Sequence, residues 1–160
     1  MNCHNMPARP MGAVELLRKD HARLLQLFID FFAARSESRR HDLAATLCEA
    51  VTSHWALEAE IFYPQLGRVL GDEGLAIRAG TEYQAVKHFV EELAHPDPGD
   101  DDFSASVHTL SALVATHIRA TEKPGGPFAA AELSNMDGAA VASLLRERRR
   151  EWMLGLRARP

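Results

Sequence analysis

Apolar residues recur every three or four positions along four long stretches of this chain, and that spacing most restricts how it folds. Such a spacing places apolar side chains along one face of an α-helix, whereas a half-buried β-strand needs strict alternation. The stretches are rich in Ala, Leu, Glu and Arg, and they contain no alternating run. They cover residues 12–35, 38–66, 74–94 and 102–123. The sequence therefore predicts an all-α fold, with Ser36 or Ser38 as the N-cap of the second helix.

Glycine and proline gather at the breaks between these stretches, around residues 71–74, 95–100 and 124–127. Connections this short favour helices that run antiparallel to their neighbours. We therefore expect an up-and-down four-helix bundle.

A fifth apolar-periodic stretch at 137–156 carries many arginines on its other face. We expect it to pack on the bundle or on a second subunit, which makes a homodimer one predicted assembly. The chain is accordingly divided into a flexible leader at 1–11, the bundle at 12–127, and a C-terminal connector with a fifth helix at 128–160.

Composition excludes several classes of protein. The 160 residues are 46% hydrophobic and 25% charged, as in one ordinary globular domain. The net charge of -4 argues against nucleic-acid binding, which needs an excess of Lys and Arg. No apolar run approaches the ~18 residues of a membrane span, the start lacks a signal-peptide stretch, and two cysteines are too few for a disulfide framework. We expect a cytoplasmic protein that binds neither nucleic acid nor membranes.

Histidine and glutamate interrupt the apolar faces where core side chains are expected. His21 lies in the first stretch, His54 and Glu58 in the second, and His117 in the fourth. Burying such groups is costly unless each is hydrogen-bonded, paired or bound to a metal. His54 and Glu58 are four residues apart, so they share one helix face and can reach one ion. Imidazole with carboxylate suits iron, zinc or manganese, and helical bundles hold metals in this way.

Each of these residues also has a purely structural interpretation, because a single buried histidine is more often hydrogen-bonded in the core than bound to a metal. The joint pattern favours the metal, since histidine interrupts three separate stretches. We weigh this metal-binding bundle against a metal-free bundle that acts as an interaction or regulatory module.

Four short motifs stand within the helical stretches. They are LRKDH at 17–21, HWALEAEIFYP at 54–64, EYQAVK at 82–87 and HIRATEK at 117–123. Across residues 12–127 these motifs resemble the hemerythrin-like (HHE cation-binding) family, and the second is the most specific. The resemblance implies a four-helix bundle with a non-haem di-iron centre. It also implies oxygen, nitric oxide or peroxide chemistry, iron or redox sensing, or iron handling.

The resemblance implies that four residues are metal ligands, namely His21, His54, Glu58 and His117. Two positions depart from the family pattern. Tyr83 follows Glu82 where the family has Glu-His, and Thr121 lies four residues after His117 where the family has a glutamate, with Glu122 displaced by one.

Three arrangements are therefore open. In the first arrangement, Tyr83 binds as tyrosinate and Glu122 binds as carboxylate, so that a second metal ion is retained. Alternatively one ion binds at His21, His54 and Glu58, completed by His117. In the third arrangement no metal binds, and the hydroxyl of Tyr83 bonds Glu58 or a histidine across the core.

The expected cofactor is one or two iron ions, oxo-bridged if two, with another divalent metal as the alternative. The expected partner is dioxygen, another small diatomic molecule or a peroxide. Simple binding and peroxide breakdown both fit the pattern, so no residue is assigned a catalytic role. Thr121 is expected to bond the carbonyl of the preceding turn.

Overall fold

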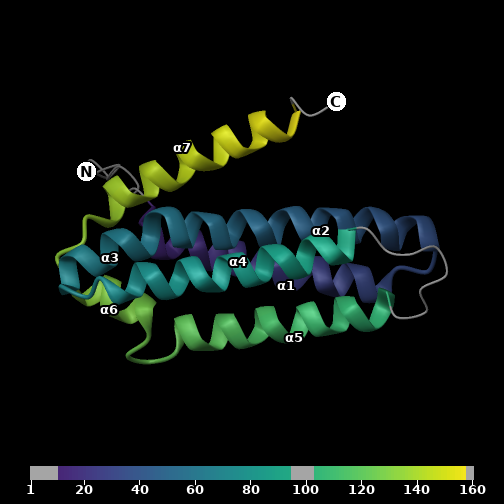
Figure 1. Ribbon diagram of the computed structural model, residues 1–160, viewed down its shortest axis with the longest axis horizontal. Coiled ribbons are helices and arrows are strands. Elements are labelled where there is room, and N and C mark those ends of the chain that lie inside the picture. The colour runs from purple at the N-terminus through teal and green to yellow at the C-terminus, as the bar shows by residue number, and fades with distance from the viewer. Residues whose placement is uncertain (1–10, 95–102, 158–160) are drawn as a thin grey trace, which may run out of the picture.

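The computed structural model describes residues 11–94 and 103–157, and all regular structure in these ranges is helical. The bundle is formed by α1 (Ala13–Ala33), α2 (Glu37–Leu57) with its continuation, α4 (Gly74–Ala94) and α5 (Phe103–Glu122). These long helices lie alongside one another and alternate in direction (Figure 1). The all-α antiparallel bundle is confirmed. The predicted leader lies outside the described residues, apart from Met11.

The predicted second helix is a single rod with an irregular turn in its middle. It consists of α2, the π-helical turn η1 (Glu58–Phe62) and α3 (Tyr63–Leu70). The N–H of Tyr63 donates to the carbonyl of Glu58, five residues earlier, as in a π-helix. This hydrogen bond brings Tyr63 closer to the face of Glu58 than an α-helix would, which the apolar periodicity did not predict.

The ends of this rod have identifiable causes. The hydroxyl of Ser36 accepts a hydrogen bond from the N–H of Arg39 at 3.3 Å, which confirms one of the two predicted N-caps. At the other end Gly71 has φ 69, the left-handed conformation that terminates a helix with little strain in glycine. The carboxylate of Asp72 then accepts from the N–H of Gly74 at 3.0 Å, where α4 begins.

The buried apolar residues of the described chain form two separate clusters. One includes Leu24, Phe28, Val51, Val90, Val107, Leu110 and Val114. The other includes Leu17, Leu57, Phe62, Leu66, Phe128, Val141 and Leu145. On α1, His21 falls between Leu17 of one cluster and Leu24 of the other. The polar interruptions therefore form a layer between two apolar regions.

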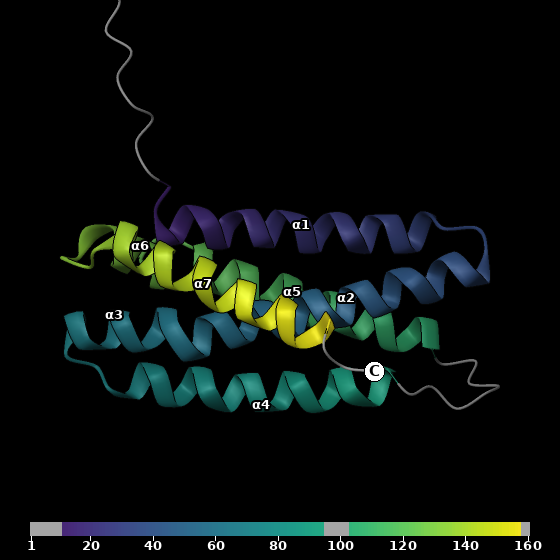
Figure 2. The same cartoon turned by 90° about the horizontal axis from the view of Figure 1, so that it is seen from above.

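The C-terminal region contains two helices rather than one. The short helix α6 (Pro127–Leu133) precedes α7 (Gly138–Arg157), and only the second of them was predicted. Phe128 of α6, which lies in the segment predicted as a connector with a fifth helix, is fully buried and belongs to the core. Seen from above, α7 lies across the bundle (Figure 2).

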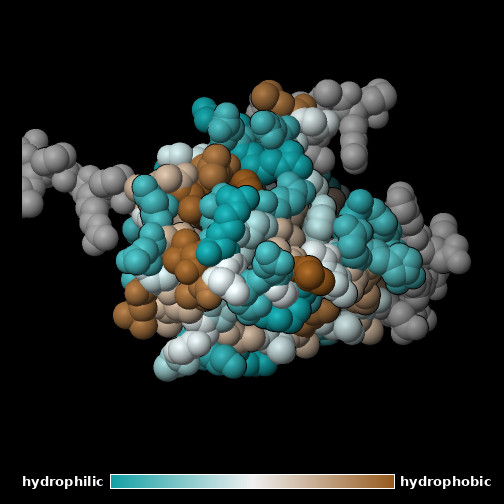
Figure 3. All heavy atoms as spheres, turned by 60° about the vertical axis from the view of Figure 1, so that its left-hand side comes forward, coloured by the Kyte–Doolittle hydropathy of each residue, from teal (hydrophilic) through white to brown (hydrophobic). Residues whose placement is uncertain are grey.

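At the end of the molecule that includes α3 and α6, apolar side chains lie interspersed with polar ones (Figure 3). Val69, Leu70, Ile77 and Leu133 are the exposed apolar residues of this region. Within the described ranges, no helix has an apolar segment long enough to cross a lipid bilayer.

We expect Phe128→Ala to lower the free energy of unfolding by about 3–5 kcal/mol, because it removes a fully buried aromatic ring. The matched control is Leu133→Ala in the same short helix, where the side chain is 89% exposed and the expected change is below about 0.5 kcal/mol. Urea unfolding of the metal-free protein measures both. Equal effects of the two substitutions would contradict the docking of α6.

Candidate metal centre

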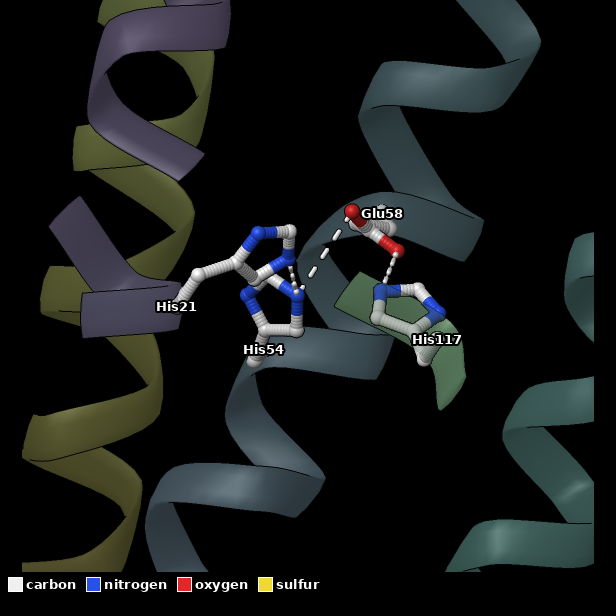
Figure 4. Close-up of side chains that lie close together, drawn as sticks. All are labelled: His21, His54, Glu58 and His117. Carbon is white, nitrogen blue, oxygen red and sulfur yellow. Dashed lines mark hydrogen bonds and ion pairs between the residues drawn. The ribbon is translucent and has the colours of Figure 1, made fainter. Parts of the chain in front are cut away.

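Four predicted ligands, one from each of four helical elements, meet inside the bundle (Figure 4). They are His21 of α1, His54 of α2, Glu58 of η1 and His117 of α5, which we call the His–Glu group. One ligand atom from each residue lies within 4.8 Å of the others. The first three residues are 2% exposed, and the His117 side chain is 8% exposed. The structure therefore assembles these four side chains in one place shielded from water.

All three imidazoles present Nε2 to the centre of the group. The Nε2 atoms of His21 and His54 are 3.0 Å apart. Glu58 lies between the other pair, with Oε1 3.5 Å from His54 Nε2 and Oε2 3.1 Å from His117 Nε2. One carboxylate thus faces imidazole nitrogens from two different helices.

The polar atoms of this group are incompletely satisfied by protein partners. Within the described part of the chain, Glu58 Oε1 and His117 Nε2 are buried without a hydrogen-bond partner. The Nε2 atoms of His21 and His54, 3.0 Å apart, attract each other only when a proton or a cation lies between them. Unpartnered buried polar atoms are costly, and a cation would engage their lone pairs together. The donor set of nitrogen and oxygen atoms fits iron, zinc or manganese.

Carboxylates lie beside the outer nitrogens of two of these histidines. Glu122 Oε1 is 2.6 Å from His21 Nδ1, and Asp20 Oδ2 is 3.7 Å from His54 Nδ1. At 2.6 Å, Glu122 accepts a hydrogen bond from His21 Nδ1–H and leaves the Nε2 lone pair of His21 for the centre. The contact of Asp20 with His54 is longer, at ion-pair distance, and His54 Nδ1 has no hydrogen-bond partner in the described part of the chain. Glu122, predicted as a candidate ligand, therefore contacts the outer side of His21 instead of joining the His–Glu group. Sequence reasoning missed Asp20, although it directly precedes His21.

Tyr83 lies among different charges. Burial raises the pKa of its hydroxyl, and the charged side chains that act on it are Glu60, Arg148 and Glu91. Glu58 acts instead on Tyr63, whose pKa is raised by burial and by that carboxylate. Tyr63 is thus the tyrosine on which the carboxylate of the group acts, and it lines one pocket together with His117. Its place five residues after Glu58 was visible in the sequence, but the π-helical turn that makes this spacing significant was not.

Thr121 behaves as predicted and contributes no ligand to the group. Its buried hydroxyl donates to the backbone carbonyls of His117 at 3.0 Å and Ile118 at 3.1 Å. The hydroxyl is therefore satisfied within its own helix.

Aromatic rings pack against the imidazoles from outside the group. Phe128 of α6 stacks on His21 with ring centroids 5.3 Å apart and planes 11° apart. The rings of Trp55 and His117 have centroids 4.3 Å apart. These contacts restrict how the two imidazoles can turn.

A pocket of about 430 Å³ adjoins His117 between α4 and α5. Its walls are mainly apolar, with polar groups contributed by a few side chains that include Tyr63, Glu82 and Thr121. The pocket leaves room for a small molecule on one side of the His–Glu group.

The pKa shifts of His21 and Glu58 suit a cation. Burial and the neighbouring His54 lower the pKa of His21 to about 4, so this imidazole is neutral near pH 7. Burial alone would raise the pKa of Glu58, but His54 and His117 outweigh it and hold the pKa below the ordinary value. Neutral imidazoles and an ionised carboxylate are the forms that coordinate metals.

We expect the metal-free protein to lose stability as the pH falls from 6.5 to 4. In that window the unfolded chain binds a proton at His21 that the folded chain, with its pKa of about 4, does not. Urea unfolding at several pH values measures this, and His21→Gln should flatten the dependence. His88→Ala, which removes an exposed histidine, should keep the wild-type slope. The same slope in wild type and His21→Gln would contradict the prediction.

A family model described as Hemerythrin HHE cation binding domain matches residues 12–127. This span covers most of the chain and contains the whole His–Glu group. Comparisons with curated proteins and with solved structures gave no match.

Proposed function

This chain belongs to the hemerythrin HHE cation-binding family, and we propose that it binds one iron ion through the His–Glu group. The observation that carries the proposal is the convergence of four buried donor atoms within 4.8 Å. A second ion would need further ligands, and neither predicted candidate, Tyr83 or Glu122, joins the group. Of the three arrangements that the sequence left open, we therefore favour the single ion completed by His117.

Iron is proposed because the donors are nitrogen and oxygen atoms without thiolates, and because of the family to which the chain belongs. When bound, the ion would supply a coordination position for dioxygen, another small diatomic molecule or a peroxide. The pocket beside His117 supports this role, since it gives a small molecule space next to the group. Tyr63 lines this pocket, and its protonated hydroxyl, whose pKa is raised by burial and by Glu58, can donate a hydrogen bond to a bound molecule.

We expect about one iron per chain after anaerobic reconstitution with ferrous ion, measured by elemental analysis. Glu58→Gln keeps the size of the side chain but removes its charge, and should weaken iron binding by more than about 100-fold. His88→Ala removes an exposed histidine and should bind as wild type does. Less than about 0.2 iron per chain in the wild type would favour the metal-free bundle instead. Two irons per chain would restore the two-ion arrangement.

We expect Tyr83→Phe to leave the iron content and the visible spectrum of the ferric protein unchanged. The reason is that Tyr83 lies among Glu60, Arg148 and Glu91, away from the charges of the His–Glu group. Absorption spectroscopy of wild type and variant tests this. A visible band that disappears on substitution would show that tyrosinate is a ligand after all.

A further inference from the structure

Helix α7 is linked to the His–Glu group through the carboxylate of Asp20, which lies between Arg149 and His54. We propose that Arg149 of α7 acts through Asp20 as a positioning residue for His54, so that metal binding and the docking of α7 stabilise each other. This inference rests on the proposed function, because it takes His54 to be a metal ligand.

Three arginines join α7 to the rest of the protein. Arg149 pairs with Asp20 of α1, and Arg148 Nε lies 2.6 Å from Glu60 Oε2 of η1. Arg146 donates to the backbone carbonyl of Met11 at 3.2 Å. The arginine-rich face of this helix is therefore partly an attachment surface, and Arg149 is the arginine whose partner lies beside the His–Glu group.

The Asp20 carboxylate serves two groups with the same oxygen. Its Oδ2 pairs with Arg149 Nη2 and lies 3.7 Å from His54 Nδ1. The Asp20 side chain is 14% exposed, so its position depends on these neighbours more than on water. Arg149 thus fixes a carboxylate that faces the outer nitrogen of His54 at ion-pair distance. His54 Nδ1 has no hydrogen-bond partner in the described part of the chain, so Asp20 acts on this imidazole through its charge. A carboxylate beside the outer nitrogen orients a ligating histidine.

The two halves of α7 are held by different forces. Val141, Ala142 and Leu145 in its first half are buried in the core, whereas Met153 and Leu154 near its end are 52% and 65% exposed. Figure 1 shows α7 diverging from the bundle toward its C-terminal end. The second half is therefore attached mainly by ion pairs.

A cavity of about 280 Å³ lies beside this second half and is lined by Asp20, His54, Arg149 and Trp152, among others. The indole Nε1 of Trp152 is buried with no hydrogen-bond partner in the described part of the chain. Close apolar packing does not fix α7 here, so the contact between Arg149 and Asp20 carries much of the attachment. Because coupling between two equilibria is reciprocal, a metal that orders His54 and Asp20 must also favour the docked helix.

The first experiment measures ferrous-ion affinity of the full chain by anaerobic competition with a chelator. We expect Arg149→Ala to weaken binding about 10-fold or more, as loss of an outer partner of a ligand does. Arg148→Ala is the matched control, because it removes the neighbouring ion pair of the same helix without touching Asp20. It should change the affinity by less than about 3-fold. Arg149→Lys, which keeps the charge, should recover part of the loss.

The second experiment measures hydrogen exchange of the backbone amides in 146–155 with and without ferrous ion. In the wild type, metal should slow this exchange, and in Arg149→Ala the effect should disappear although the variant still binds metal at saturating concentration. This readout reports on α7 itself, so a general loss of stability would not reproduce it.

Specific results overturn the inference. If the wild type binds iron but Arg149→Ala and Arg148→Ala weaken it equally, or if metal leaves exchange in α7 unchanged, the coupling is absent while the proposed function stands. If the wild type binds no iron, the proposed function itself fails. Should Arg149→Ala not fold, Asp20→Asn applies the same test, because it removes the charge between Arg149 and His54 and keeps a side chain of similar size.

Discussion

The buried charge of Glu58 is the constraint on which the rest of the structure depends. Its side chain is 2% exposed and lies in a polar layer between two apolar clusters. Among the described residues, the charged or polar side chains that face this carboxylate are imidazoles, which are neutral when they coordinate a metal, and the group leaves polar atoms unpartnered. A cation would satisfy the carboxylate and the imidazoles together. The four side chains that are costly to bury in the core are therefore the ones on which the proposed function rests.

The surroundings of the His–Glu group show how a helical bundle supports such a site. Glu122 and Asp20 lie at outer imidazole nitrogens, and Phe128 and Trp55 pack against imidazole rings. Asp20, Trp55 and Glu122 belong to the predicted motifs, whereas Phe128 comes from α6, so a segment outside those motifs also contributes to the geometry of the group. Through Asp20 the influence extends to α7, which links the metal centre to the surface of the molecule.

The sequence predicted what depends on periodicity. The spacing of apolar residues fixed the long helices, and the interruptions within them identified His21, His54, Glu58 and His117, because one face of a helix must point inward. The sequence did not predict the features that depend on a local irregularity of a helix or on a contact between distant segments. The π-helical turn that associates Tyr63 with the site has no periodic signal. The outward role of Glu122 depends on where α5 ends relative to α1, which only the packed structure determines.

The most direct test of this account is a crystal structure of the iron-loaded protein with anomalous diffraction measured at the iron absorption edge. The account predicts one anomalous peak per chain, lying between the three Nε2 atoms and the carboxylate of Glu58. A second peak beside Tyr83, or an empty centre in which the histidines and Glu58 are satisfied only by one another and by water, would contradict it.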